Sequence, residues 1–372
     1  MIQDPSFMKT EAEHSRVWRL VLLAGLFYAI LFIKVLSSHQ WDPLAFVLLT
    51  PDDLPAGQTW GVGYDGRFSY HIAVNPLGST EGLDEPNYRY QRIMYPLLVK
   101  LFSFGMKELV PWVMLAVNWI SSGVACYFLG LSLLRRKVSP WYVLVLILSL
   151  GYLLAMRMDL LEPMALALAL AGWSMYEESR PRVAILFFIL SGLTKEIGLV
   201  FPFAIAAWEL LSRNPRRALI LLGGSLLPYL VLRLYLANRF GIPEMAIEKS
   251  ALILIPYWGF SYLEGIPSKV LVVLWSVGPS IVFGLWAAWE IVRRKLRNIE
   301  NPDIILVLAQ ALLIAVLPIP TWKDPLAIFR FNLGLIVAVL LCLARSHPKA
   351  LPFAAGLWLS SGLVLLLIPG ML

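Results

Sequence analysis

Long apolar runs, separated by short polar segments, recur along the chain from Val17 to its end. About 20 consecutive apolar residues are needed to cross a hydrocarbon core of roughly 30 Å. Shorter runs predict helices that are kinked, tilted or partly buried inside a bundle. The pattern therefore predicts an all-α polytopic membrane protein, with 1–372 forming a single transmembrane domain. The stretches that meet or approach the required length are Val17–Leu36, Pro111–Leu134, Ala218–Ala237, Val270–Val292 and Leu351–Ile368.

Short clusters of arginine and lysine punctuate the apolar stretches and predict the orientation of the chain. Such loops stay preferentially in the cytoplasm. Counting from a cytoplasmic N-terminus then gives about 11 transmembrane helices (10–12) and an exoplasmic C-terminus. The segment Arg92–Gly105 would break this charge pattern if it crossed, so we interpret it as a re-entrant or interfacial helix. The clusters are Arg135-Arg136-Lys137, Arg180-Pro181-Arg182, Arg213 with Arg216-Arg217, Arg293-Arg294-Lys295 with Arg297, and Arg345 with Lys349, after Lys9, Arg16 and Arg19 near the start.

Two long loops fall on the outer side in this topology, Ser37–Arg92 and Asn238–Ser268, together with the shorter segment Thr321–Asn332. The two long loops are too short to form an independent catalytic domain, but each can form amphipathic helices that rest on the membrane surface. Most acidic residues also face outward, and charge sorting during membrane insertion explains the majority of them. Any active site must therefore be built from outer loops and helix ends.

Composition supports the membrane assignment and excludes several classes of function. Hydrophobic residues make up 59% of the chain, charged residues 15%, and the formal net charge is +7. No G-x-x-x-x-G-K-[ST] or H-E-x-x-H motif is present, and the four histidines are scattered, so nucleotide hydrolysis and zinc proteolysis are not expected. We expect no nucleic-acid partner. No internal repeat typical of secondary transporters is visible, which weakens a transport function.

Lys195 and Glu196 interrupt an apolar interval that runs from Val183 to Leu211 between two basic clusters. They must either lie mid-membrane in one over-long helix or cap a short hairpin. Ionisable residues at such depth cost several kcal/mol unless they pair or line a water-filled cavity. Two arrangements satisfy this requirement. Lys195 and Glu196 can belong to a salt bridge that caps a helix, or they can form the wall of a water-filled cavity.

Glu162 directly precedes Pro163 in the segment "RMDLLEPMALALALAG". Proline suits the first turn of a helix, and a carboxylate near that turn faces the positive end of the helix dipole. Glu162 is therefore expected at a helix start. This explanation does not account for Arg157 and Asp159, which place three charges within six residues between spans.

The first outer loop carries an aromatic-Asp-Gly-x-aromatic element, Tyr64–Phe68, followed by "YRYQRIMYPLL" leading into the membrane. This order resembles the bacterial branch of the GT-C glycosyltransferases, which are polytopic enzymes that use polyprenyl-phosphate sugars, and also the related GPI-anchor mannosyltransferases. "LLEPMALALALAG" and "SGLTKEIGLVFP" are similar to further elements of that family, with Lys195 in place of an arginine. The resemblance covers Trp60–Pro202 and is mostly topological beyond it.

One departure from the family concerns the acids of the first loop. Many GT-C enzymes have two neighbouring acids there, whereas Asp65 stands alone and Asp52-Asp53 lies upstream in a proline-flanked turn. A single acid permits a divalent cation but does not require one. No metal-ligating residues are therefore assigned, and no cofactor is certain.

Glycosyl transfer from a lipid phosphate needs a base for the acceptor hydroxyl and cations for the leaving phosphate. Asp65 is the candidate base. Arg89 and Arg92, three positions apart, can present two planar guanidinium groups to a phosphate, although the same pair would also bind acidic lipid head groups. The remaining candidates have supporting roles: Tyr64 for stacking, His71 for the acceptor, Lys195 and Arg330 for the phosphate, and Glu162 and Glu196 for orienting the cations or binding acceptor hydroxyls.

The residues and the resemblance together imply an integral membrane hexosyltransferase of the GT-C type. It would move a sugar from a polyprenyl-phosphate donor to an acceptor hydroxyl on a glycolipid, glycopolymer or protein. Inversion at the sugar is what the family implies. The expected location is the bacterial cytoplasmic membrane, among membrane lipids, with the site facing outward. Two alternatives remain: a transporter or flippase of a lipid-linked sugar or anion, and an O-antigen-type ligase or polymerase.

Overall fold

The chain forms a bundle of helices in the computed structural model, which describes residues 5–50, 63–76, 80–241, 253–294 and 299–364. No strand occurs within these ranges. The α-helices are α1 (Pro5–Ser38), α2 (Leu44–Val47), α3 (Gly66–Val74), α4 (Pro86–Arg89), α5 (Met94–Phe102), α6 (Val110–Arg135), α7 (Val143–Ile147), α8 (Leu150–Arg157), α9 (Glu162–Glu177), α10 (Pro181–Thr194), α11 (Val200–Leu211), α12 (Pro215–Phe240), α14 (Ile266–Val272), α15 (Gly278–Arg293), α16 (Asp303–Ala315), α17 (Ile319–Lys323), α18 (Pro325–Phe331), α19 (Leu333–Ser346) and α20 (Leu351–Leu363).

Several helices are long and apolar enough to cross a membrane, so the chain is a helical multi-pass membrane protein. Within the described ranges there are 5 such helices, or 6 if the pair Pro140–Ile147 and Leu150–Arg157, bent by 61°, is one span. Four of the five coincide with predicted spans. The five are His14–Ser38, Lys107–Arg135, Pro215–Phe240, Ile266–Arg293 and Pro325–Ser346.

The predicted count of 11 spans is not supported. Helices α9, α10, α11 and α16 have 16, 14, 12 and 13 residues. At 1.5 Å per residue they reach only about 18–24 Å, which is less than the roughly 30 Å of a hydrocarbon core. Composition alone counted these apolar runs as crossings because it does not reveal where each helix breaks.

The break at Lys195 and Glu196 makes α10 and α11 a short hairpin, one of the two arrangements predicted. Lys195 has extended backbone, with φ −157° and ψ 131°, and the 3₁₀ turn η5 (Glu196–Leu199) follows it. Pro181 at the start of α10 and Glu209 near the end of α11 line the same cavity, so the two helices run in opposite directions. Lys195 and Glu196 therefore lie at the tip of the hairpin.

The segment 321–332 was expected to be an outer loop, and that expectation is wrong for most of its length. Asp324 accepts a hydrogen bond from the Leu326 backbone N–H at 3.0 Å and so caps the start of α18. Because α18 runs into α19 with only Asn332 between them, Arg330 lies on a helix and not in a loop. The predicted span Leu351–Ile368 coincides in part with α20, which has 13 residues and is not one of the helices long enough to cross among the described residues.

Helix α5 covers most of the segment 92–105 that broke the charge pattern. Nine residues reach about 14 Å, roughly half of the hydrocarbon core, so α5 is too short to cross. Helix α3, in the first predicted outer loop, has nine residues and packs against α5 and α6. Most of its side chains are buried in protein, which differs from the amphipathic surface helix expected there.

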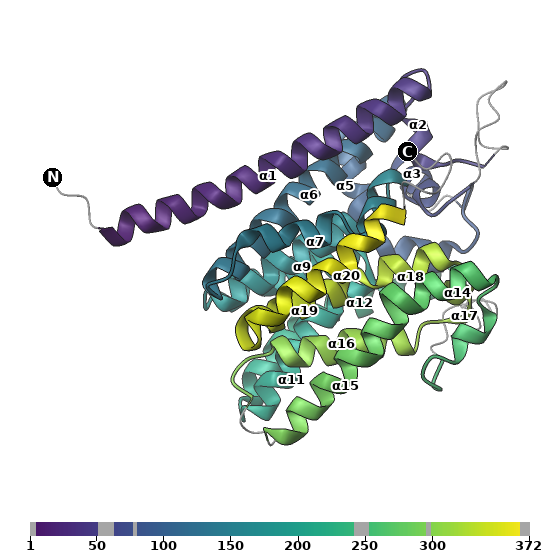
Figure 1. Ribbon diagram of the computed structural model, residues 1–372. Helices are drawn as coiled ribbons and strands as arrows, with labels where there is room; N and C mark the ends of the chain where they lie inside the picture. Colours follow the sequence, from purple (N-terminus) through teal and green to yellow (C-terminus); the bar gives the residue numbers. More distant parts are fainter. Residues whose placement is uncertain (1–4, 51–62, 77–79, 242–252, 295–298, 365–372) are drawn as a thin grey trace.

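The helices differ sharply in how much protein surrounds them. The span formed by α18 and α19 is 89% buried, whereas α12 is only 17% buried and presents its apolar side chains outward. Helix α1 packs along α6 at one edge of the bundle, and α15 and α16 pack together at the opposite edge (Figure 1). The apolar centre is therefore built around α19, with α1 and α12 at the periphery.

The two ends of the bundle carry different side chains. Arg136 at the end of α6 and Arg345 on α19 both bind Asp303 at the start of α16, at 2.7 and 2.9 Å. This joins three of the helix ends near the basic clusters at one end of the molecule. Glu162 lies 15 residues before Glu177 on α9, about 22 Å along the helix axis. The candidate site around Glu162 is thus at the opposite end from the basic clusters.

Candidate active site

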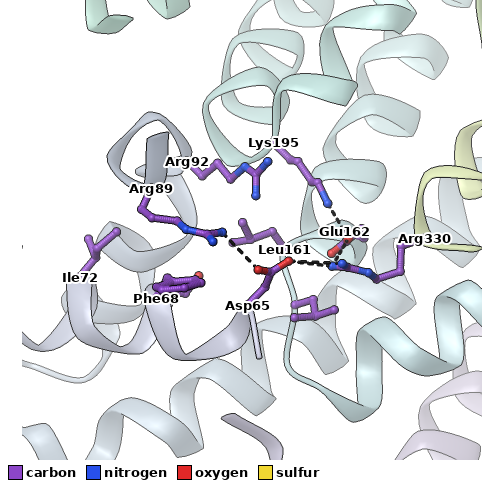
Figure 2. Close-up of a pocket in the computed structure, with 11 residues that line it drawn as sticks. Asp65, Phe68, Ile72, Arg89, Arg92, Leu161, Glu162, Lys195 and Arg330 are labelled. Atoms are coloured by element: carbon purple, nitrogen blue, oxygen red, sulfur yellow. Dashed lines mark hydrogen bonds and ion pairs between the residues drawn. The ribbon is translucent and has the colours of Figure 1, made fainter. Parts of the chain in front are cut away.

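A cavity of about 290 Å³ opens among the start of α3, the helices α4, α17 and α18, and the break between α10 and η5. It is close to the lower limit of the roughly 300–1,000 Å³ typical of small-molecule sites. A smaller hollow of about 20 Å³ shares lining residues with this cavity and is also bordered by Phe68, Leu161 and Glu162 (Figure 2). We call the larger space the site cavity. Five charged side chains line both spaces: Asp65, Arg89, Arg92, Lys195 and Arg330.

Asp65 is positioned by the tight start of α3. Gly66 approaches the backbone so closely that a Cβ atom there would lie 2.6 Å from the carbonyl oxygen of Met158, in the turn after α8. Only glycine fits such an approach without a shift of the chain. The Asp65 side chain makes no capping hydrogen bond to α3 and keeps 36% of its surface exposed. Its carboxylate is therefore fixed in place but still open to a substrate.

Two arginines from distant parts of the chain hold the Asp65 carboxylate. Arg89 Nη1 lies 3.2 Å from Oδ1, and Arg330 Nη2 lies 3.3 Å from Oδ2 (Figure 2). Desolvation by burial acts to raise the pKa of Asp65, but the positive charges of Arg330, Arg89, Arg92 and Lys195 outweigh it and hold that pKa well below its usual range. Asp65 is therefore ionised in the unliganded protein.

Glu162 at the start of α9 joins two cations beneath the site cavity. Its Oε1 accepts from Lys195 Nζ at 2.5 Å and from Arg330 Nη1 at 3.0 Å. All three side chains are at most 4% exposed. Pro163 stands in the first turn of α9, as predicted. Lys195 therefore pairs with Glu162 and also lines the cavity, so of the two alternatives the cavity wall is present.

Arg92 and Glu196 form a second ion pair, between η2 (Tyr90–Arg92) and η5. The guanidinium donates from Nη2 to Oε1 at 2.5 Å and from Nε to Oε2 at 3.0 Å. Arg92 Nη2 also donates to the Tyr88 hydroxyl at 2.5 Å. This two-bond fork fixes the plane of the guanidinium beside the site cavity.

Arg89 is held in the same way by Asp84, with Nε to Oδ1 at 2.8 Å and Nη2 to Oδ2 at 2.9 Å. Its guanidinium carbon lies 3.6 Å from the centroid of the Phe68 ring. An arginine above an aromatic face with a fork to a carboxylate is rigidly oriented. Because a phosphate would use the same fork, Asp84 occupies the position that an anionic ligand would take.

The two remaining predicted residues, Tyr64 and His71, differ in their relation to the site cavity. The Tyr64 hydroxyl donates to Asp324 Oδ2 at 2.5 Å and accepts from Arg330 Nη2 at 3.1 Å, so Tyr64 supports Arg330 from behind. His71 lies on α3 with its ring packed against Gly82, and it is not among the described residues that line the site cavity. The structure therefore brings together all of the predicted site residues except His71.

Sequence reasoning did not assign Asp84 or Asp324 to the site. Both lie at the start of proline-initiated helices, because Asp84 is two residues before Pro86 and Asp324 is directly before Pro325. Glu162 before Pro163 has the same arrangement. An acid just before a proline-initiated helix is therefore a sequence pattern from which Asp84 and Asp324 could have been predicted. The pair Asp52-Asp53 lies outside the described residues.

No group of three or more His, Cys, Asp or Glu side chains converges as metal ligands within the described ranges. Comparisons of the sequence with protein-family models, with curated proteins and with solved structures find no match. The chemistry of the site must therefore be argued from its own residues.

Proposed function

We propose that the protein is a membrane glycosyltransferase of the GT-C type that transfers a sugar from a polyprenyl-phosphate donor to an acceptor hydroxyl. The observation that supports this proposal is the site cavity, in which the partly exposed carboxylate of Asp65 faces four cations, Arg89, Arg92, Lys195 and Arg330. Asp84, Glu85 and Asp324 also line this cavity. A base beside several phosphate-binding groups is the pairing that the reaction requires. The donor phosphate would lie against the arginines, and the acceptor would approach Asp65.

In the proposed step, the acceptor hydroxyl attacks the anomeric carbon of the sugar. A bond forms between the acceptor oxygen and that carbon, and the bond from the carbon to the phosphate oxygen breaks. The hydroxyl proton moves to Asp65, and the electron pair of the broken bond leaves with the lipid phosphate. Arg89 and Arg92 stabilise the negative charge that develops on the phosphate.

The depressed pKa of Asp65 bears directly on this role. A carboxylate held by two arginines is a weak base while those arginines interact with it alone. A bound donor phosphate would draw Arg89 and Arg330 toward its own charge and so raise the proton affinity of Asp65. The base would then become effective only when the donor is present, which limits unproductive chemistry in the empty site.

Replacement of Asp65 by asparagine tests the proposal, because the amide keeps the shape of the side chain and cannot accept the proton. Purified protein in lipid vesicles would be supplied with a panel of synthetic polyprenyl-phosphate hexoses and hydroxyl acceptors. We expect the unsubstituted protein to transfer sugar and the Asp65→Asn variant to lose about 10²–10⁴-fold in rate. The matched control is Asp42→Asn, in the same outer segment but not lining the site cavity, which should keep full activity.

Three outcomes would redirect the proposal. Full transfer by the Asp65→Asn variant would remove Asp65 as the base. Movement of a lipid-linked sugar across the vesicle membrane without transfer would favour a transporter or flippase, and transfer only from diphosphate-linked oligosaccharides would favour an O-antigen-type ligase or polymerase. Measuring both sugar transfer and lipid movement with the donor panel therefore separates the three classes in one set of vesicles.

A further inference from the structure

A second cavity, of about 660 Å³, lies at the opposite end of the bundle from the site cavity. It opens where α9 ends, α10 begins, α11 ends and α12 begins, near the basic clusters that predict the cytoplasmic side. Its volume is within the roughly 300–1,000 Å³ range of small-molecule sites. We call it the basal cavity. It lies about 22 Å from Glu162 along α9, so it is separate from the proposed active site.

The charged side chains that line the basal cavity balance one another in number. Three are arginines, Arg135, Arg217 and Arg345, and three are glutamates, Glu177, Glu209 and Glu300. Glu177 pairs with Arg135 at 3.3 Å and with Arg345 at 3.7 Å. In the described part of the chain, no ion pair within 4 Å involves the other three: Arg217, Glu209 and Glu300. One cation and two acids are thus left for a ligand.

Glu209 is the most informative of these residues. It is 2% exposed, and its Oε1 accepts from the Tyr176 hydroxyl. Its Oε2 has no hydrogen-bond partner among the described residues. A buried carboxylate oxygen without a donor is costly, which points to a ligand that supplies an N–H or O–H group. A ligand with only acceptor groups would not satisfy it.

An apolar surface leads away from the basal cavity along α12. Ile220 lines the cavity, and Leu227 and Leu234 follow at seven-residue intervals, so the three lie on one face of the helix. All three are exposed. A row of exposed apolar side chains on a membrane-spanning helix faces acyl chains. The basal cavity is therefore continuous with a surface suited to lipid tails.

We propose that the basal cavity binds a zwitterionic phospholipid whose head group carries a phosphate and a primary ammonium. The phosphate would bind Arg217, the ammonium would donate to Glu209 and lie near Glu300, and one acyl chain would follow the Ile220–Leu234 face of α12. Arg217, the lining arginine outside those ion pairs, supports a ligand with one anionic group, and the two glutamates with the orphaned oxygen of Glu209 support one that also carries N–H donors. This inference does not depend on the proposed glycosyl transfer.

The test uses the full-length protein in nanodiscs of stated lipid composition, followed by native mass spectrometry of the lipids that remain bound. We expect phosphatidylethanolamine to be retained at least fivefold over phosphatidylcholine, which has the same phosphate but no N–H donor, and over anionic phosphatidylglycerol. Glu209→Gln and Arg217→Gln should each remove most of this preference. Arg216→Gln is the matched control, because Arg216 is exposed next to Arg217 and is not a lining residue of the cavity.

Equal retention of the three lipids by the unsubstituted protein would overturn the proposal. So would an ethanolamine preference that Glu209→Gln and Arg217→Gln leave intact, because the lipid would then bind elsewhere. A preference for phosphatidylglycerol would show a basic surface and not a zwitterion site, which also overturns it. The unfolding midpoint with and without added phosphatidylethanolamine is a second readout, since a ligand that binds only the native state raises it.

Discussion

Arg330 Nη2 lies 3.3 Å from Asp65 Oδ2, although 265 residues separate the two in the chain. The same guanidinium reaches Glu162 Oε1 at 3.0 Å. One side chain on α18 therefore joins the start of α3 to the start of α9. The candidate site exists only when the last third of the chain packs against the first, so its activity and its stability should respond together to changes at these positions.

Glu162→Gln should destabilise the protein by about 3 kcal/mol, because it leaves Lys195 and Arg330 buried without their shared carboxylate. The measurement is the free energy of unfolding in mixed micelles, followed by tryptophan fluorescence. Glu178→Gln is the control: Glu178 pairs with Arg135 at the basal end and is 30% exposed, so its loss should cost less than about 1 kcal/mol. Equal costs for the two variants would contradict a structural role for the Glu162 cluster.

Arg89→Lys should raise the KM for a polyprenyl-phosphate donor about tenfold, which is about 1.4 kcal/mol. Lysine keeps the charge but loses the planar fork that now binds Asp84 and stacks on Phe68. Initial transfer rates at varied donor concentration give the value. Arg67→Lys serves as the comparison, since Arg67 also lies over Phe68 but does not line the site cavity. If both substitutions left KM unchanged, Arg89 would have no part in donor binding.

Gly66→Ala should lower kcat at least tenfold, because its Cβ would meet the Met158 carbonyl oxygen at 2.6 Å and displace Asp65. Overpacking of this kind also costs about 1–3 kcal/mol of stability. Gly223→Ala makes the same change on α12, where no atom lies within 4 Å of the added group, and should be neutral or slightly stabilising. The measurements are the transfer rates and the unfolding midpoints of Gly66→Ala and Gly223→Ala. Normal kcat in Gly66→Ala would show that Asp65 tolerates displacement.

Titration of Asp65 should not lower kcat/KM for the donor as the pH falls to about 4. The folded-state pKa of Asp65 is lowered from 3.8, so the carboxylate stays ionised as the pH falls through the ordinary range of aspartate. The ion pairs with Arg89 and Arg330 contribute stability above the unfolded-state pKa, and that contribution is lost only as the pH falls through the lower folded value. The measurement is kcat/KM for the donor between about pH 4 and 8. An acid limb near pH 6 that disappears in Asp65→Asn would contradict this assignment.

The sequence was sufficient for the helical membrane class. Apolar length located α1, α6, α12 and the α14–α15 segment, because each is a single uninterrupted run. It failed for α9–α11, where helices of normal apolar composition end after 12 to 16 residues. A break at Lys195 was one of the two arrangements that the sequence allowed, and Glu162 before Pro163 predicted the start of α9. The lengths of these helices could not be predicted, because the ion pairs that join their ends form with distant segments.

Residue chemistry in outer segments predicted most of the candidate site. Asp65, Arg89, Arg92, Lys195 and Arg330 were selected for the base and the cations that the expected reaction needs, and they line one cavity. His71 was selected by the same reasoning but packs against Gly82, because its direction depends on the turn of α3. Asp84 and Asp324 were missed, since an acid that orients an arginine has no local signature beyond its place before a proline-initiated helix.

The short hairpin of α10 and α11 has a consequence for the surrounding bilayer. Phe203 and Leu210 on α11 are exposed, and so is Leu186 on α10, yet these helices reach only about 18–21 Å, whereas the apolar part of α1 extends for 25 residues. A bilayer of uniform thickness cannot match both the short α10–α11 hairpin and the longer apolar part of α1. We expect the membrane to thin beside the hairpin and to bring lipid phosphates down toward Lys195 and Glu196. The protein would then work faster in vesicles of shorter-chain lipids, in which less deformation is needed.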